Sequence, residues 1–232
     1  MIKGLLFDYG GTIDTNGLHW GRVLWDSYEK HQAGVPEGVF LKAYSYGERA
    51  LAIHPIIEPR HTFLDTLQLK VEQQFLFLRN EGIDLPASLG KAIAQDCYQF
   101  AKSSVQQAAP VLAQLAERYP LVMVSNFYGN LSTVLQDFGI AGYFQAIVES
   151  AVVGVRKPDA AIYALGVKEL GFAPDECVVI GDSYSKDILP AKTVGCQTIW
   201  LNVKGWETTE VSSEADVEID DFAQIPEVIG GL

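Results

Sequence analysis

The segment LLFDYGGT at residues 5–12 decides the fold. A short, mostly apolar run reaches Asp8 and then gives way to two glycines and Thr12. This pattern is typical of a strand that is buried on both faces and ends in a tight turn. Such strands belong to parallel sheets, in which ligands bind beyond the carboxyl ends of the strands. We therefore expect Asp8 to lie at the functional edge of a parallel sheet.

Similar apolar runs recur along the chain and alternate with helical patterns. The runs occupy residues 2–7, 121–124, 146–148, 178–180 and 198–201. The helical patterns occupy residues 111–119, directly after Pro110, and residues 131–138 and 159–170. This alternation predicts an α/β fold with a Rossmann-like three-layer α/β/α core around a central parallel sheet.

The stretch between the first two predicted strands has a different character. Apolar residues recur at helical spacing over residues 64–78 and 89–100. No run within this stretch resembles a buried strand. We therefore predict an inserted α-helical cap domain at residues 15–108, and a core domain formed by residues 1–14 and 109–232.

Composition excludes several classes of partner. The chain has 232 residues, of which 48% are hydrophobic and 20% charged, which is ordinary for a globular protein. Its formal net charge of −12 argues against nucleic acid as a partner, because phosphate backbones are bound by clustered Lys and Arg. The sequence has no run of about 18 uncharged apolar residues, so we expect no membrane span.

The cysteines and the first residues of the sequence give an expectation for the cellular compartment. Cys97, Cys177 and Cys196 are an odd number without a CxxC pair, which argues against a disulfide framework and against a thiolate zinc site. The opening residues MIKGLLFDYGG lack the apolar stretch and cleavage site of a signal peptide. A reducing, cytoplasmic location is the expectation that fits both observations.

Polar residues stand at or after the ends of several predicted strands. Asp8 follows the first strand, Ser125 ends LVMVSN's apolar run, Lys157 lies in VGVRKP, and Asp182 begins the acidic segment DSYSKD. In this order, with a helical insertion between the first and the second, these segments resemble the four motifs of the haloacid dehalogenase-like hydrolase superfamily. The resemblance covers essentially the whole chain. One motif alone is a weak signal, but four in order are a strong one.

The resemblance implies a Mg²⁺-dependent phosphatase that acts on a small phosphorylated metabolite through an aspartyl-phosphate on Asp8. Asp8, Lys157, Ser125 and Thr12 are the implied catalytic residues. The implied metal ligands are Asp8, the backbone carbonyl of Gly10, Asp182 and Asp187, and the implied phosphate-binding residues are Thr12, Ser125, Asn126 and Lys157. Taken singly, each has an ordinary structural interpretation, such as a solvated lysine, a turn serine or a helix cap. Their joint arrangement favours the site.

One position departs from the family pattern. Most phosphatases of the family carry a second aspartate two residues after the nucleophile, which protonates the leaving group and then activates water. That position is Gly10 here. General acid–base catalysis contributes about 10²–10⁴-fold, so we expect slower turnover, above all with leaving groups that need a proton. Asp14 is close in sequence, but we do not expect it to substitute.

Gly10 keeps two other functions open. A chain without the acid is also consistent with a low-turnover protein that binds a phosphorylated ligand or a protein partner. Family members that cleave carbon–phosphorus bonds place a small alanine there and use a cap lysine as a Schiff base. The candidate cap lysines are Lys30, Lys42, Lys70, Lys91 and Lys102, and surface solvation is the expectation for each. Dehalogenation is disfavoured, because dehalogenases place a tyrosine there and usually lack the acidic motif that Asp182 and Asp187 preserve.

Overall fold

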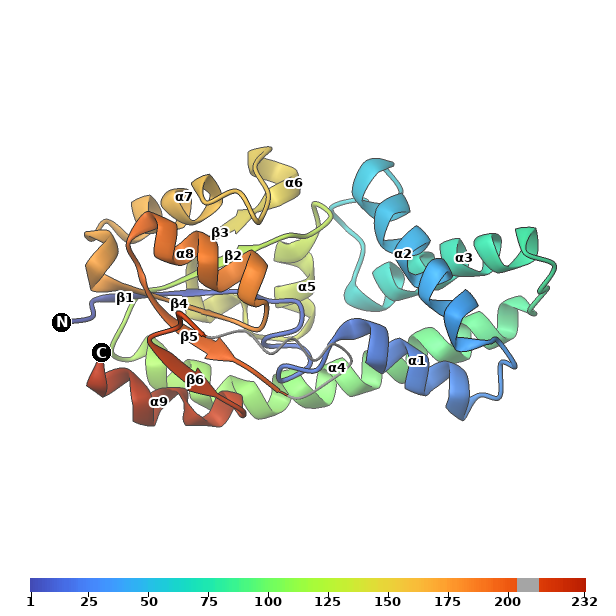
Figure 1. The fold of residues 1–232 in the computed structure, drawn as a ribbon, viewed down its shortest axis with the longest axis horizontal. Helices are drawn as coiled ribbons and strands as arrows, with labels where there is room; N and C mark the ends of the chain where they lie inside the picture. Colours follow the sequence, from blue (N-terminus) through green and yellow to red (C-terminus); the bar gives the residue numbers. More distant parts are fainter. Residues whose placement is uncertain (204–212) are drawn as a thin grey trace.

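The computed structural model describes residues 1–203 and 213–232. Its centre is a six-stranded sheet with the order β3-β2-β1-β4-β5-β6, in which neighbouring strands pair in parallel (Figure 1). The strands are β1 (Gly4–Phe7), β2 (Leu121–Ser125), β3 (Phe144–Glu149), β4 (Cys177–Gly181), β5 (Gln197–Leu201) and β6 (Val217–Ile219). The predicted parallel α/β fold is confirmed, and the sequence pattern missed only the three-residue edge strand β6.

Helices cover both faces of the sheet. Successive side chains of a strand point to opposite faces. Leu6 therefore lies in one buried cluster with Ile162 of α7 (Ala161–Leu170), whereas Leu5 lies in another with Leu112 of α4 (Ala87–Ala116) and Ile225 of α9 (Ile225–Val228). The helices around the sheet are α5 (Leu131–Asp137), α6 (Ser150–Val153), α7 (Ala161–Leu170), α8 (Leu189–Val194) and α9 (Ile225–Val228). The core therefore has three layers, as predicted.

The register of the sheet aligns the strand ends that matter for function. Phe7 at the end of β1 is paired with Met123 of β2 and Ile180 of β4. The backbone N–H of Asp8 continues the ladder by donating to the carbonyl of Ile180, at 2.9 Å. The residues after β1, β2 and β4 consequently meet at one edge of the sheet.

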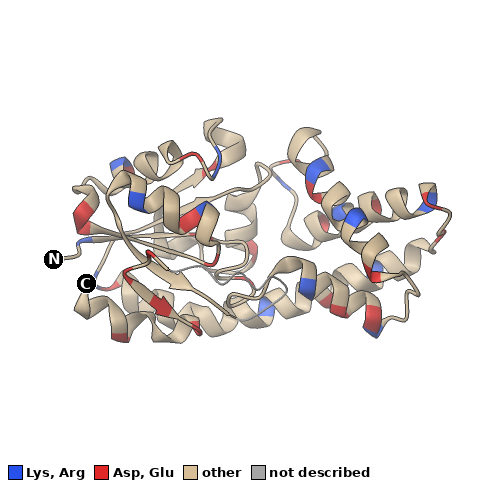
Figure 2. Cartoon of the chain, in the orientation of Figure 1, with Lys and Arg blue, Asp and Glu red and all other residues tan. Residues whose placement is uncertain are grey.

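Helices occupy the chain between β1 and β2, as the spacing of apolar residues predicts. They are α1 (Trp20–Lys30), α2 (Glu37–Ile53), α3 (Phe63–Asn80) and α4 (Ala87–Ala116), and together we call them the helical segment. A capping box of Thr62 and Asp65 begins α3. Figure 1 shows α1, α2, α3 and the first part of α4 beyond the ends of the central strands, whereas the last part of α4 runs along the sheet. Figure 2 shows acidic and basic residues interspersed along the helices.

The prediction that a new helix begins after Pro110 is wrong. Helix α4 runs without a break from Ala87 to Ala116, and Pro110 lies inside it. A proline inside a helix removes one hydrogen bond and costs about 3 kcal/mol. Here Pro110 is exposed, while Val105, Ala108 and Leu112 are buried along the other side of α4. Burial of that apolar side keeps the helix continuous through residue 108, where the sequence analysis divides the two domains.

No helix among the described residues combines the length and the apolar character that a membrane-spanning helix needs.

Candidate functional site

Side chains from three different parts of the chain form hydrogen bonds with the Asp8 carboxylate. Its Oδ1 atom accepts hydrogen bonds from Lys157 Nζ at 2.6 Å and from Ser125 Oγ at 3.0 Å. Thr12 Oγ1 lies 3.2 Å from Asp8 Oδ2 and 3.0 Å from Asp182 Oδ1. All of these residues except Asp182 are buried, and Asp182 is half-buried. The structure therefore brings together the residues that the sequence analysis selected at the strand ends.

Three carboxylates form a compact group at this edge. One oxygen from each of Asp8, Asp182 and Asp187 lies within 4.8 Å of the other two. Two glycines permit this approach: a Cβ atom at Gly11 would lie 2.5 Å from Asp182 Oδ2, and one at Gly181 would lie 2.5 Å from Asp187 Oδ2. Gly11 also has a φ of +97°, which favours glycine. The two glycines let the carboxylates crowd into the same small volume.

Lys157 joins two of these carboxylates. Its Nζ atom lies 2.7 Å from Asp187 Oδ1 as well as 2.6 Å from Asp8. Burial alone would lower the pKa of Lys157, but the adjacent Asp187 and Asp8 outweigh burial and raise that pKa. Lys157 thus remains an ammonium ion at neutral pH and supplies one positive charge to the group.

Two hydrogen-bond donors of the protein fix the Asp187 carboxylate in place. Tyr163 Oη donates to Asp187 Oδ1 at 2.7 Å, and the Ser183 N–H donates to Asp187 Oδ2 at 2.9 Å. Tyr163 was not predicted as a site residue, because it lies on the buried, apolar side of α7 and its position in the sequence is typical of a core residue. With both oxygens engaged, Asp187 is placed to orient Lys157.

The side chain of Asn126 holds the loop that carries Lys157. Asn126 Nδ2 donates to the Lys157 carbonyl at 3.1 Å, and the Lys157 N–H donates to Asn126 Oδ1 at 2.9 Å. This reciprocal pair fixes the backbone of Lys157 beside β2. A role for backbone N–H groups near Asn126 in phosphate binding stays a prediction.

Three carboxylates share one ammonium ion in this group. Burial, together with Asp8 and Asp187, raises the pKa of Asp182 well above its usual value. Burial also raises the pKa of Asp8, and Lys157 opposes that rise. Hard carboxylate oxygens are the ligands that Mg²⁺ prefers. The residues present therefore fit a divalent cation that would relieve their mutual repulsion.

The backbone around Gly10 leaves open space next to this group. Gly10 is exposed, its φ lies outside the left-handed region, and a Cβ atom at this position would meet nothing within 4 Å. A Cβ atom can therefore be added here without moving a neighbour. No local strain requires glycine at position 10.

The Asp14 carboxylate fixes the loop that follows Asp8 through two hydrogen bonds. The Gly11 N–H donates to Asp14 Oδ1 at 2.7 Å, and Trp20 Nε1 donates to Asp14 Oδ2 at 2.9 Å. The Asp14 side chain is buried, and both of its oxygens are engaged. This geometry agrees with the expectation that Asp14 does not replace the missing acid, and it ties the loop to the first residue of α1.

Titration of Asp14 should appear in the stability of the protein. Burial raises the pKa of Asp14 from 3.8 to about 7. The protonated group therefore stabilises the fold at low pH, and this contribution is lost as the pH rises from about 4 through about 7. Over this range we expect the wild type to lose roughly 4 kcal/mol of unfolding free energy relative to Asp14→Asn. Urea denaturation of both proteins at several pH values measures this difference, and a difference independent of pH would contradict it.

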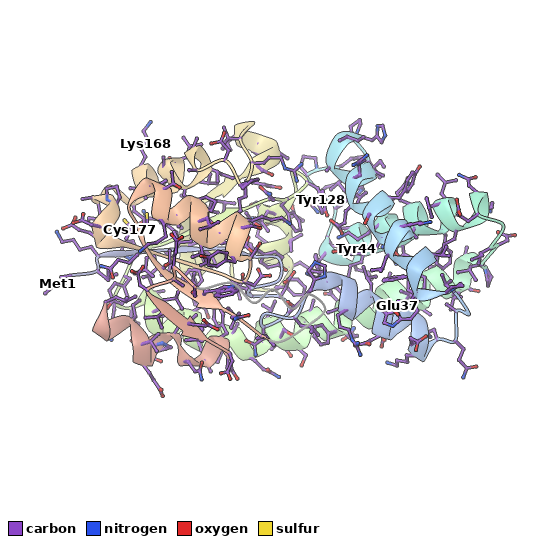
Figure 3. All side chains as sticks on the ribbon, in the orientation of Figure 1. Met1, Glu37, Tyr44, Tyr128, Lys168 and Cys177 are labelled. Carbon is purple, nitrogen blue, oxygen red and sulfur yellow. The ribbon has the colours of Figure 1, made fainter. Side chains whose placement is uncertain are left out.

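One lysine of the helical segment lies at the junction with the core, where surface solvation was expected. The Lys70 side chain is only 8% exposed, and its Nζ atom lies 2.6 Å from Glu48 Oε1. Tyr128, on the loop after β2, donates to Glu48 Oε2 at 2.7 Å. Figure 3 labels Tyr128 and Tyr44 at this junction. The four other lysines considered, Lys30, Lys42, Lys91 and Lys102, are exposed as expected.

Comparisons with known proteins point to one family. A family model described as haloacid dehalogenase-like hydrolase matches residues 2–195. The chain is 34% identical over 128 residues to phosphoglycolate phosphatase of Pectobacterium atrosepticum, covering 53% of this chain and 54% of that protein. It is 26% identical over 87 residues to phosphoserine phosphatase of Thermus thermophilus, covering 38% of this chain and 34% of that protein. The chain thus spans between about a third and about half of the length of these curated relatives.

Solved structures share the fold along the full chain. L-2-haloacid dehalogenase of Xanthobacter autotrophicus, with chloropropionic acid covalently bound, aligns with a TM-score of 0.66 and 17% identity, covering 100% of both chains. This likeness concerns the fold alone. Because the family model matches most of the sequence, from the first strand through the acidic motif, the chain belongs to the haloacid dehalogenase-like hydrolases.

Proposed function

We propose that this hydrolase is a Mg²⁺-dependent phosphatase that acts on a small phosphorylated metabolite, with Asp8 as its nucleophile. The observation that carries the proposal is the environment of Asp8, where Lys157, Ser125 and Thr12 surround one carboxylate at an edge shared with Asp182. The names of two relatives, a phosphoglycolate phosphatase and a phosphoserine phosphatase, support this class of substrate.

The side chains of this site can divide one difficult displacement into two easier ones. Asp8 attacks phosphorus, the bond to the leaving oxygen breaks, and an aspartyl-phosphate forms. Water then attacks the same phosphorus atom, releasing phosphate and regenerating the Asp8 carboxylate. Lys157 offsets negative charge on the nucleophile and the phosphoryl group, and the hydroxyls of Ser125 and Thr12 are placed to hydrogen-bond phosphoryl oxygens.

Asp8, Asp182 and the Gly10 carbonyl would hold Mg²⁺, with Asp187 supporting the site through its bond to Lys157. When bound, the ion supplies positive charge that lets an anionic substrate approach several carboxylates. The helical segment would serve as the cap, with residues 15–108 as the inserted domain. Residues 1–14 and 109–232 would form the catalytic core.

Introducing an acid at position 10 should show whether slow turnover is caused by the lack of a proton donor for the leaving group. We expect Gly10→Asp to raise kcat for alkyl phosphates by about 10²–10⁴-fold, because their leaving groups need a proton. The gain with p-nitrophenyl phosphate should be far smaller, since its leaving group is stable as an anion. Gly10 is exposed, and the Cβ atom of the new side chain meets no neighbour within 4 Å. Steady-state kinetics with both substrates in Mg²⁺ buffer measure the two gains.

Gly10→Asn is the matched control for this prediction, because its side chain has the same size as that of aspartate but its amide cannot act as a general acid. It should raise neither rate. Equal gains with both substrates, or an equal gain for Asp and Asn, would count against a missing acid as the cause of slow turnover.

Gly10 also favours a second candidate, a protein that binds a phosphorylated ligand with little turnover. Hydrolysis that depends on Asp8 in a screen of phosphate esters would eliminate this candidate. Carbon–phosphorus cleavage has less support. Lys70, the buried lysine of the helical segment, is paired with Glu48, and although burial alone would lower the Lys70 pKa, Glu48 outweighs it and raises that pKa. A raised pKa favours the ammonium ion over the free amine that a Schiff base requires.

A further inference from the structure

Lys70 stands apart from the other lysines of the helical segment because it is buried against the core. Within residues 15–108, all of which the structure describes, the other four lysines are exposed. Lys70 Nζ lies 2.6 Å from Glu48 Oε1, 5.4 Å from the centre of the Tyr128 ring and 6.0 Å from the centre of the Trp20 ring. One cation is thus enclosed by one carboxylate and two aromatic faces.

The residues that enclose Lys70 are reached from the two strand ends that carry Asp8 and Ser125. The loop after β1 passes from Asp8 through Asp14 to Trp20, and the Trp20–Asp14 hydrogen bond of 2.9 Å fixes its end. The loop after β2 passes from Ser125 to Tyr128 within three residues. Because the Asp8 and Ser125 side chains are 3.0 Å apart, both loops lead from the nucleophile to Lys70.

A chain of contacts joins this cluster to the catalytic carboxylates. Lys70 Nζ lies 6.0 Å from the centre of the Trp20 ring, Trp20 donates to Asp14, and Asp14 accepts from the Gly11 N–H at 2.7 Å, where Gly11 packs against Asp182. The charge interactions of these groups agree with this placement. Lys70 is one of the charges that lower the pKa of Asp14, in opposition to burial, the main influence, which raises it. Burial, and then Glu48, raise the pKa of Tyr44, and Asp182 adds to that rise. Figure 3 shows Tyr44 and Tyr128 labelled where the helical segment meets the core. Lys70 and its neighbours therefore lie on the side of the helical segment that faces the site.

A purely structural role does not account well for this arrangement. Replacing a buried ion pair by apolar residues of similar size is often neutral or stabilising, so the pair is weak evidence for a stabilising role. A buried ammonium beside a catalytic edge can instead bind an anion in surroundings that strengthen the attraction. Glu48 already neutralises part of the Lys70 charge, so a single further negative charge fits better than a dianion.

We propose that Lys70 is a specificity-determining residue that binds a carboxylate on the leaving group of the substrate. The preferred substrate class is then a phosphate monoester of a small carboxylic acid. Asp8 and its neighbours bind the phosphoryl end, and Lys70 binds the acid end, with Glu48 holding the ammonium in place. This proposal rests on the proposed phosphatase function, because it names the substrate of that same site.

Binding measurements test the proposal without requiring turnover. The probes are phosphoglycolate and ethyl phosphate, which differ by a carboxylate, titrated by calorimetry in Mg²⁺ buffer into the Asp8→Asn protein. We expect phosphoglycolate to bind more tightly, and an added Lys70→Met substitution to reduce this preference by about 10- to 100-fold, the effect of losing a hydrogen bond between charged groups. Lys70→Arg should retain most of the preference, and Lys91→Met, at an exposed lysine, should leave it unchanged.

Equal binding of the two esters by the Asp8→Asn protein, in which Lys70 is unchanged, would overturn the proposal. This result does not depend on whether the Lys70→Met protein folds. A preference that persists in a folded Lys70→Met protein would overturn it too. The same comparison of kcat/KM in the protein with Asp8 intact separates the two levels of inference. Absence of Asp8-dependent hydrolysis refutes the phosphatase function, whereas hydrolysis without a carboxylate preference refutes the role of Lys70 alone.

Discussion

Replacement of Asp8 by asparagine should lower kcat for phosphate-ester hydrolysis on the order of 10⁴-fold or more, as expected when a nucleophile is removed. Asparagine keeps an oxygen that can accept the hydrogen bond of Ser125, and Lys157 keeps its bond to Asp187. The loss should therefore appear in the rate and not in the fold. Hydrolysis of p-nitrophenyl phosphate measures it well, because this substrate does not depend on the acid that Gly10 lacks.

The matched control for this change is Asp175→Asn, which alters an exposed aspartate outside the site. Its activity should equal that of the wild type. If Asp8→Asn retained more than about a tenth of the wild-type rate while its circular dichroism stayed native, Asp8 would not be the nucleophile. The phosphatase mechanism would then have to be abandoned.

Replacement of Lys157 by methionine should lower the free energy of unfolding by about 3–5 kcal/mol, because it leaves buried carboxylates without their cation. The Lys157 side chain is 2% exposed, and the side chains of its two partners, Asp8 and Asp187, are 8% and 1% exposed. The loss should be largest near neutral pH. It should shrink as the pH falls, since protonation removes the uncompensated negative charges.

Urea denaturation without Mg²⁺, at neutral pH and again under mildly acidic conditions, measures both the loss and its pH dependence. Lys168→Met is the control, because Lys168 is exposed on α7 and projects from the molecule in Figure 3. Its effect should stay within about 0.5 kcal/mol. Similar losses for the two variants, or a loss at Lys157 that grows in acid, would show that the ion pairs contribute little.

Most of the sheet was predictable because its strands are buried on both faces. Such strands appear in the sequence as short apolar runs, as in 178–180, where all residues of β4 are buried. Strand β6 escaped because it is three residues long, with the exposed Glu218 between Val217 and Ile219. Pro110 misled the analysis because the local preference of proline to begin a helix was overridden by packing along α4.

The residues around Asp8 were predictable for a topological reason, and their partners were not. Parallel strands bring their carboxyl ends to one edge, so Asp8, Ser125 and Asp182 could be placed together from the strand pattern. Tyr163 and the pair of Lys70 with Glu48 depend on how separate helices pack. A hint for Lys70 existed in α3, because it shares the buried side of the helix with Leu67 and Val71. Its partner on α2 has no such signal.

The continuity of α4 limits how access to the site can be controlled. Helix α4 is one of the two connections between helices α1 to α3 and the sheet, and a continuous helix of 30 residues is stiffer than a loop. A rotation of α1, α2 and α3 relative to the sheet must carry α4 along or bend it. Pro110 has no N–H to donate to the carbonyl one turn earlier, so α4 bends at the lowest cost in the turn before Pro110. A change in the angle between the two parts of the chain that α4 joins would therefore be centred on this turn.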